Sequence, residues 1–152
     1  MKRVLTYGTF DLFHIGHLNL LRRAKELGDY LIVGVSTDEF NELKGKISII
    51  PYKERQEIIR AIKYVDEVIA ENSWDQKIED IQKYNIDILV MGEDWRGRFD
   101  HLSQYCEVVY LPRTKNISST ELKNKMKYLL DIDINKVQEA IAILKKIVDE
   151  FQ

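Results

Sequence analysis

Strand-like and helix-like segments alternate along the first 128 residues, and this alternation constrains the fold more than any other feature. The run at 30–36, YLIVGVS, is almost continuously apolar, which is typical of a strand buried on both faces. By similar patterns we expect strands at 3–7, 68–70, 88–91 and 107–111, and helices at 17–28, 51–65, 75–84 and 118–128. Strands separated by helices of this length form a parallel sheet with right-handed crossovers. The sequence therefore predicts an α/β fold, a Rossmann-like five-stranded parallel sheet flanked by helices.

The composition restricts the binding partners. A net charge of −2 over 152 residues provides no general field for nucleic acid or for an anionic membrane. Phosphate binding would have to come from local clusters of cations and backbone amides. The single Cys106 excludes an internal disulfide, and we interpret it as an inert core thiol. The chain has no signal-peptide pattern and no run of about 20 apolar residues, so we expect a soluble cytoplasmic protein without membrane insertion.

The segment 8–17, GTFDLFHIGH, follows the first expected strand and leads into the first expected helix. It holds His14 and His17, with Gly16 between them. A helix N-terminus suits phosphate, and imidazoles placed there can donate to the transition state of phosphoryl or nucleotidyl transfer. Each histidine could instead cap the helix or fill the core. A zinc site is a poor alternative, because a third ligand is missing nearby.

A second strand-to-helix turn at 111–120 reads LPRTKNISST. Arg113 can bind phosphate oxygens through two parallel hydrogen bonds. The hydroxyls of Thr114, Ser118 and Ser119 could donate beside it, or could simply cap the following helix. In open parallel sheets, ligands bind beyond the carboxyl ends of the strands, where both turns are expected.

These two blocks, together with STDEFN, KYVDEV and MGEDW, resemble the cytidylyltransferase family of nucleotidyltransferases over roughly residues 1–127. The resemblance implies a nucleotidyltransferase fold and transfer of the cytidylyl group from CTP to glycerol 3-phosphate. CDP-glycerol and pyrophosphate would form by direct in-line attack, and the product would feed teichoic acid or a related capsular polymer. It also implies Mg²⁺ bound mainly through the CTP phosphates, with no protein metal site, and a homodimer.

The resemblance assigns the histidines and the nearby cations to catalysis. It implies that His14 and His17 contact the triphosphate and stabilise the transition state, and that Arg113 binds the phosphates. Lys44 and Lys46 would reach the β- and γ-phosphates from a loop that closes over CTP as a lid. The alternative for these two is a pair of solvated loop lysines.

The binding residues follow from the same resemblance. The residues implied for CTP are Gly8, Thr9, Phe10, Gly16, Arg55, Gly92, Thr114, Ser118 and Ser119. Those implied for the acceptor are Asp11, Trp74, Lys77 and Asp94. Arg55 would contact the nucleotide or a neighbouring subunit, whereas Trp74 could equally be a packing residue. Lys63 and Asp66 are uncertain, because Lys63 stands where arginine is common and Asp66 has a structural alternative.

Two departures from the family pattern lie in the second turn. Asn116 stands where glycine is usual, and Ser119 where threonine is frequent. Asparagine accepts a left-handed backbone better than most residues, and serine keeps the hydroxyl donor. We expect both changes to be tolerated.

Other functions remain open at this point. The letters HIGH also occur in class I aminoacyl-tRNA synthetases, but nothing here resembles their KMSKS motif. The acceptor could be glycerol 2-phosphate, another polyol phosphate, phosphocholine or phosphoethanolamine, and the nucleotide could be ATP. A non-catalytic nucleotide-binding subunit is the alternative from another class.

The C-terminal segment 131–152 extends past the resemblance. Its apolar residues alternate spacings of three and four, the pattern of a heptad seam: Ile134, Val137, Ile141, Leu144, Val148 and Phe151. This pattern predicts a helix that packs on its own domain or that dimerises. We therefore expect a catalytic domain at 1–128 and a C-terminal helical extension at 129–152.

Overall fold

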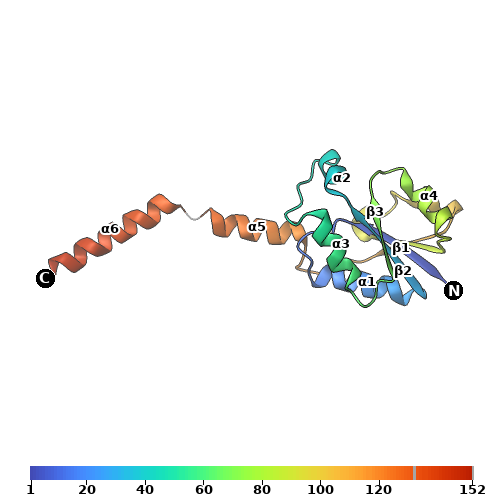
Figure 1. Cartoon of the computed structure of the whole chain (residues 1–152). Coiled ribbons are helices and arrows are strands. Elements are labelled where there is room, and N and C mark those ends of the chain that lie inside the picture. Colours follow the sequence, from blue (N-terminus) through green and yellow to red (C-terminus); the bar gives the residue numbers. More distant parts are fainter. Residues whose placement is uncertain (132, 152) are drawn as a thin grey trace. The chain divides into compact units, whose positions relative to one another are not determined.

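The computed structural model describes residues 1–131 and 133–151 (Figure 1). The chain divides into two compact units, Met1–Ser119 and Thr120–Gln152. The first unit contains the whole sheet and all the site residues that the sequence singled out. Within the described ranges, no helix combines the length and the apolar character that crossing a membrane requires.

One parallel sheet forms the centre of the first unit, as predicted. Its strands are β1 (Arg3–Gly8), β2 (Tyr30–Ser36), β3 (Glu67–Glu71), β4 (Ile88–Gly92) and β5 (Glu107–Leu111). They are ordered β3-β2-β1-β4-β5, so the chain changes direction across the sheet between β1 and β4. Ligands of such sheets bind at this switch point, beyond the carboxyl ends of the strands.

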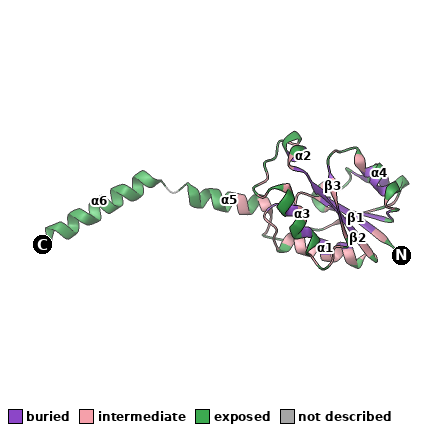
Figure 2. Cartoon of the chain, in the orientation of Figure 1, coloured by how far each residue is buried: buried purple, intermediate pink, exposed green. Residues whose placement is uncertain are grey.

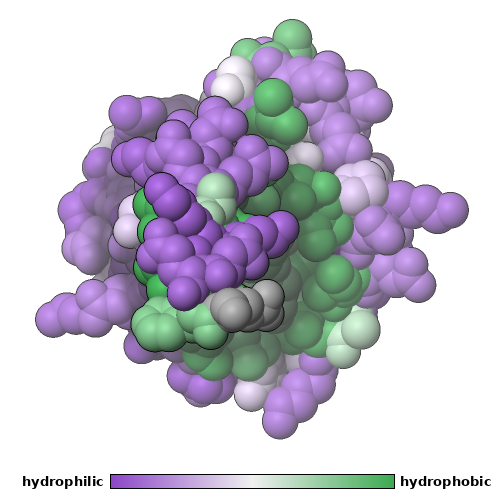
Figure 3. Space-filling view, turned by 90° about the vertical axis from the view of Figure 1, so that its left-hand side faces the viewer, coloured by the Kyte–Doolittle hydropathy of each residue, from purple (hydrophilic) through white to green (hydrophobic). Residues whose placement is uncertain are grey.

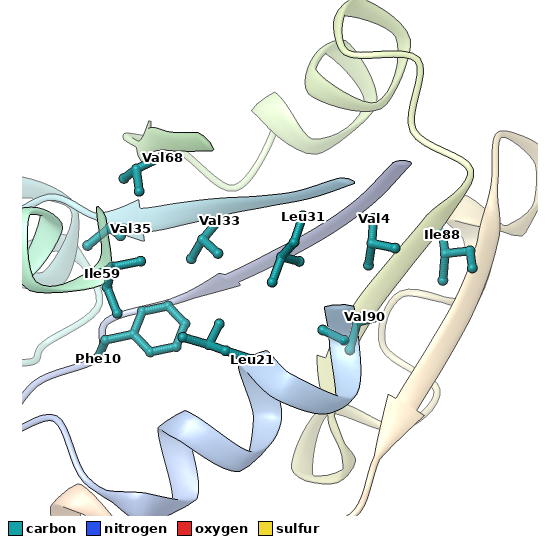
Figure 4. Packing of buried hydrophobic residues seen from close by; sticks show 11 residues of the cluster. Val4, Phe10, Leu21, Leu31, Val33, Val35, Ile59, Val68, Ile88 and Val90 are labelled. Atoms are coloured by element: carbon teal, nitrogen blue, oxygen red, sulfur yellow. The ribbon is translucent and has the colours of Figure 1, made fainter. Parts of the chain in front are cut away.

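Helices and short 3₁₀ turns complete the first unit: α1 (Ile15–Glu26), α2 (Asp38–Leu43), α3 (Tyr52–Arg60), α4 (Gln76–Lys83), η1 (Glu93–Trp95) and η2 (Asp100–Gln104). On one face of the sheet, Leu21 of α1 and Ile59 of α3 pack with Phe10 against the strands (Figure 4). On the other face, Ile81 of α4 and Leu102 of η2 pack against a second cluster. Because the strands are covered on both sides, the central ones are buried along most of their length (Figure 2).

The helix boundaries differ from the sequence prediction at several ends, most clearly at the start of α1 and the end of α3. α1 begins at Ile15 rather than at 17, because His14 occupies the N-cap position. α3 ends at Arg60 rather than at 65. Ile62 and Val65 still pack against the core, but from the turns that follow the helix, so their spacing imitates a longer helix. The helical spacing of Ile58 and Ile59 predicts that both face the core, but Ile58 is 38% exposed.

The second unit contains most of α5 (Ser119–Leu130) and all of α6 (Ile134–Glu150). The predicted C-terminal helix is present, and the Asp133 side chain caps it by accepting from the backbone N–H groups of Asn135 and Lys136. Every described residue of α6 is exposed, including the apolar seam (Figure 2). Figure 3 shows hydrophobic residues at the molecular surface beside hydrophilic ones. The domain limits 1–128 and 129–152 stay a prediction.

Candidate active site

The segment between β1 and α1 follows an unusual backbone path. Phe10 and Leu12 have φ values of 54° and 49°, a left-handed conformation that bulky residues rarely adopt. Such backbone conformations are costly and cluster at functional sites. The turn brings His14 to the N-cap of α1 and places His17 in the first turn of that helix.

His14 and His17 form a reciprocal capping pair. His14 Nδ1 accepts from Gly16 N–H at 3.0 Å, and His17 Nδ1 accepts from His14 N–H at 3.3 Å. The two rings are stacked with their centroids 3.8 Å apart. A β-carbon on Gly16 would lie 2.8 Å from the His14 ring, so only glycine fits there. Because both Nδ1 atoms accept, the neutral rings carry their protons on Nε2.

The Nε2 atom of His14 is buried and has no hydrogen-bond partner within the described part of the chain. A buried polar atom without a partner is costly and points to a missing ligand or water. The sequence expectation of a phosphate donor at this position therefore agrees with the geometry.

Burial keeps both imidazoles neutral. Burial lowers the pKa of His14, and the positive charge of Arg113 adds to this effect. Burial likewise lowers the pKa of His17 to about 3, with His14 adding to the shift and Asp11 opposing it. The rings of Phe10 and Phe13 lie 5.3 Å and 5.5 Å from the His17 ring and contribute to this apolar surrounding. At neutral pH both rings are therefore uncharged, and their Nε2 protons are available for donation.

Asp11 connects the histidine segment to the loop after α2. Its buried carboxylate accepts from the backbone N–H groups of Leu12, Ile49 and Ile50 at 2.8–3.1 Å. Its backbone carbonyl accepts from Ser119 Oγ at 2.6 Å. Contact with the acceptor was expected from the sequence, but these bonds favour a role in positioning the loop.

Arg55 is another buried connector. Its side chain has no exposed surface, and it donates to the carbonyls of Ile50, Thr9 and Ser36 and to the carboxylate of Asp38. These bonds occupy all three guanidinium nitrogens. The geometry therefore favours a scaffolding role over the contact with nucleotide or neighbouring subunit that was expected from the sequence.

The second turn lies beside the first. Thr114 Oγ1 accepts from Asn19 Nδ2 of α1 at 3.0 Å, and Arg113 forms an exposed ion pair with Asp94 at 3.3 Å. Asn116 has a φ of 64°, so the prediction that asparagine would adopt the left-handed backbone here is confirmed. Ser118 directly precedes α5.

Two of the expected lysines meet at one indole ring. Lys44 Nζ lies 5.5 Å and Lys77 Nζ 5.4 Å from the centroid of the Trp74 ring, which is 49% exposed. Lys77 is buried and forms an ion pair with Glu71 at 2.8 Å. Burial lowers the pKa of Lys44, and the negative charge of Glu71 opposes that shift. Lys46 is exposed on the same loop as Lys44.

The remaining expected residues lie either at the carboxyl ends of β1 and β4 or before the start of β3. Gly8 and Gly92 end neighbouring strands β1 and β4, and the Thr9 hydroxyl donates to Asn41 Oδ1 at 3.2 Å. Lys63 and Asp66 lie before β3, at the opposite end of that strand from Glu71. Asp66 accepts from Lys25 Nζ and from Leu31 N–H, so it serves the fold and is not brought to the site.

Several polar residues that organise this region were missed by sequence reasoning: Asn19, Ser36, Asp38, Asn41 and Glu71. Ser36, Asp38 and Asn41 lie in the STDEFN block, to which no site residue was assigned, whereas Asn19 and Glu71 lie outside the blocks that carry the resemblance. For Ser36 and Glu71 the sequence did contain a signal, because each ends an apolar strand at the edge of the sheet where ligands bind.

Comparisons with known proteins agree with this geometry. A family model described as cytidylyltransferase-like matches residues 5–125. A Bacillus spizizenii protein named glycerol-3-phosphate cytidylyltransferase is 61% identical over 126 residues, covering 83% of this chain and 98% of that protein. A protein of the same name from Staphylococcus aureus is 55% identical over 126 residues, which cover 83% of this chain and 96% of that protein. The solved structure of a lipopolysaccharide core biosynthesis protein from Thermoplasma volcanium matches with a TM-score of 0.67 at 29% identity, covering 76% of this chain and 99% of that one.

Proposed function

The chain belongs to the cytidylyltransferase-like family, and we propose that it transfers the cytidylyl group of CTP to glycerol 3-phosphate, giving CDP-glycerol and pyrophosphate. The observation that carries this proposal is the 61% identity to a glycerol-3-phosphate cytidylyltransferase over 98% of that protein's length. The expected Rossmann-like nucleotidyltransferase fold is confirmed by the sheet order and by the Thermoplasma volcanium structure.

The reaction is an in-line displacement at the α-phosphorus of CTP. A phosphate oxygen of the acceptor forms the new P–O bond while the bond to the bridging oxygen of pyrophosphate breaks. A phosphate monoester is an oxyanion at neutral pH, so the attack needs no general base. Catalysis then depends on orientation and on stabilising the charge that moves to pyrophosphate.

The two histidines supply donors for that charge. Their Nε2 protons, fixed by the Nδ1 bonds, would face the phosphates beside the N-terminus of α1. Because their surroundings already hold them neutral, they need not lose or gain a proton during the reaction. Arg113, Lys46 and Lys44 would offset the remaining negative charge from the surrounding loops.

The residues of the site fit a magnesium ion that arrives with CTP. The described residues contain no group of three His, Cys, Asp or Glu side chains that could hold a metal ion. Mg²⁺ prefers oxygen ligands and commonly binds through substrate phosphates, where it neutralises charge on the triphosphate. Asp11 would not be its ligand, because its carboxylate binds three backbone amides.

The acceptor phosphate would bind near Trp74, where Lys44 and Lys77 converge. Asp94, just beyond β4, would accept from the hydroxyls of the polyol once its ion pair with Arg113 gives way to substrate. Gly92 would allow backbone groups to approach the cytosine, since no atom lies within 4 Å of the place of its missing β-carbon. We extend the proposal to a cytoplasmic homodimer: the similarity to glycerol-3-phosphate cytidylyltransferases supports the location, and the exposed apolar seam of α6 supports the dimer.

Pyrophosphate release tests the proposed function. The purified protein is incubated with Mg²⁺, with CTP or ATP, and with acceptors headed by glycerol 3-phosphate, followed by glycerol 2-phosphate, phosphocholine and phosphoethanolamine. We expect release only with CTP and glycerol 3-phosphate together. Release with CTP and a different acceptor would overturn the substrate, and CTP binding without turnover by any pair would favour a non-catalytic subunit.

A further inference from the structure

We propose that Glu71 is a positioning residue that holds Lys44 and Lys77 together as one anion-binding pair, acting directly on Lys77 and through Ser36 on Lys44. This inference rests on the proposed function and adds to it the residues that set the geometry of the acceptor phosphate site.

The hydrogen bonds form one chain. Lys77 Nζ donates to Glu71 Oε2 at 2.8 Å, and Ser36 Oγ donates to Glu71 Oε1 at 2.7 Å. Lys44 Nζ in turn donates to Ser36 Oγ at 3.3 Å. One carboxylate therefore uses its two oxygens to orient two ammonium groups, one directly and one through a hydroxyl.

This series of hydrogen bonds joins three parts of the fold: the edge of the sheet, the end of α2 and the helix α4. Ser36 and Glu71 are register partners at the carboxyl ends of β2 and β3, whereas Lys44 follows α2 and Lys77 lies in α4. Both ammonium groups lie within 5.5 Å of the Trp74 ring centroid. The carboxylate thus links two cations that come from different elements of the fold.

Stability alone is a weak reason for this arrangement. The side chains of Lys77 and Glu71 are each 5% exposed, and a buried ion pair often stabilises a fold no more than apolar residues of similar size would. A requirement for cations at a fixed spacing, where a dianionic phosphate must bind, accounts for the pair directly.

The charges around Lys44 provide a second argument that Glu71 acts on this lysine. Burial lowers the pKa of Lys44. The positive charges of Lys46 on the same loop, Lys77 in α4 and Arg55 in α3 lower it further. Glu71 from β3 is the one charge among these that raises it. Without that carboxylate, Lys44 would lose its proton at a lower pH, and the alkaline limb of the activity profile would move to lower pH.

The first experiment compares steady-state kinetics of Glu71→Gln with the wild-type protein, varying each substrate. Glutamine keeps the shape but removes the charge, so we expect the KM for glycerol 3-phosphate to rise about tenfold or more, because one partner of a buried charge pair is lost. The alkaline limb should move to lower pH. Glu67→Gln is the matched control, since Glu67 lies at the other end of β3 and pairs with the Tyr30 hydroxyl. Its kinetics should stay those of the wild type.

The second experiment does not depend on turnover. The acetylation rate of each lysine is measured by peptide mass spectrometry in folded protein, with folding checked by circular dichroism. We expect the rate at Lys77 to rise about tenfold in Glu71→Gln, and the rate at Lys44 alone to rise about threefold in Ser36→Ala, which leaves the Glu71–Lys77 pair intact.

The outcomes separate the two proposals. Wild-type protein without turnover would refute the proposed function, while the lysine rates would still decide the role of Glu71. Unchanged rates at both lysines in Glu71→Gln would overturn the inference. If that variant does not fold, Ser36→Ala decides instead, with an unchanged rate at Lys44 refuting it.

Discussion

At the scale of single residues, the candidate site is organised by two neutral histidines whose Nδ1 atoms accept the hydrogen bonds of the helix cap. The capping bonds fix the tautomer, and burial fixes the protonation state. The partnerless Nε2 atom of His14 is the clearest single sign of a binding site among the described residues.

Replacing either histidine should therefore remove a transition-state donor. We expect His14→Ala and His17→Ala to lower kcat by about 100-fold or more, the usual loss for one such donor. The measurement is pyrophosphate release with CTP and glycerol 3-phosphate. His101→Ala, an exposed histidine in η2, is the matched control and should keep full activity. Near-normal kcat in a folded His14→Ala protein would refute the donor role.

The neutral state of His17 also predicts how stability depends on pH. Its pKa falls from an ordinary 6.5 to about 3 on folding, so the unfolded chain binds the proton more readily. This contribution to stability is complete above pH 6.5 and is lost as the pH falls toward 3. Carboxylates with lowered pKa, such as Asp38 with an ordinary value of 3.8, add their own loss mainly at the acid end of this range.

Denaturant unfolding at pH values from 6.5 down to 4 measures this loss. We expect the free energy of unfolding of the wild-type protein to fall over that range, and that of His17→Asn to fall less. His101→Asn should follow the wild-type curve. Parallel curves for His17→Asn and the wild type would show that His17 is not the group responsible.

At the scale of elements, the loop between α2 and α3 is held by buried side chains rather than by its own hydrogen bonds alone. Asp11 binds the backbone of Ile49 and Ile50 from the histidine segment, and Arg55 binds Ile50 and Thr9 from α3. The loop that carries Lys44 and Lys46 is thereby tied at its far end to the same turn that presents the histidines.

Arg55→Lys tests this connection. Lysine keeps the charge but cannot make the same set of directed bonds, so we expect a loss of about 2–4 kcal/mol in the free energy of unfolding. Limited proteolysis should also cut the loop faster. Arg60→Lys is the control, because Arg60 lies on the same helix but is exposed, and its side chain donates to Gln56 one turn earlier. An equally small effect of both substitutions would contradict the scaffolding role of Arg55.

At the scale of the whole molecule, the family match and the C-terminal helix are separate parts of the sequence. The match ends at residue 125, whereas α6 begins at Ile134. The proposed site residues all lie in the unit Met1–Ser119. An exposed apolar seam on a helix outside the family match suggests a role in assembly rather than in catalysis.

Truncation after Tyr128 separates these two roles. We expect the shortened chain to keep the wild-type kcat and KM values, because no proposed site residue is removed. Sedimentation should show a lower oligomeric mass if the seam joins two copies. A full-length monomer, or an unchanged mass on truncation, would refute dimerisation through α6, and a loss of activity would place part of the site beyond residue 128.

Local patterns in the sequence were sufficient for the individual strands and for the position of the histidine pair, because each depends on neighbours close along the chain. The left-handed Asn116 was expected from the family pattern, in which glycine is usual at that position. Local patterns failed for the end of α3, where tertiary packing holds Ile62 and Val65 against the core without a helix. They also failed to indicate that Arg55 is buried, because its partners are carbonyls and a carboxylate from distant segments. The link from Glu71 to Lys44 and Lys77 was likewise decided only by the fold, since it requires two strand ends and two helical segments to meet.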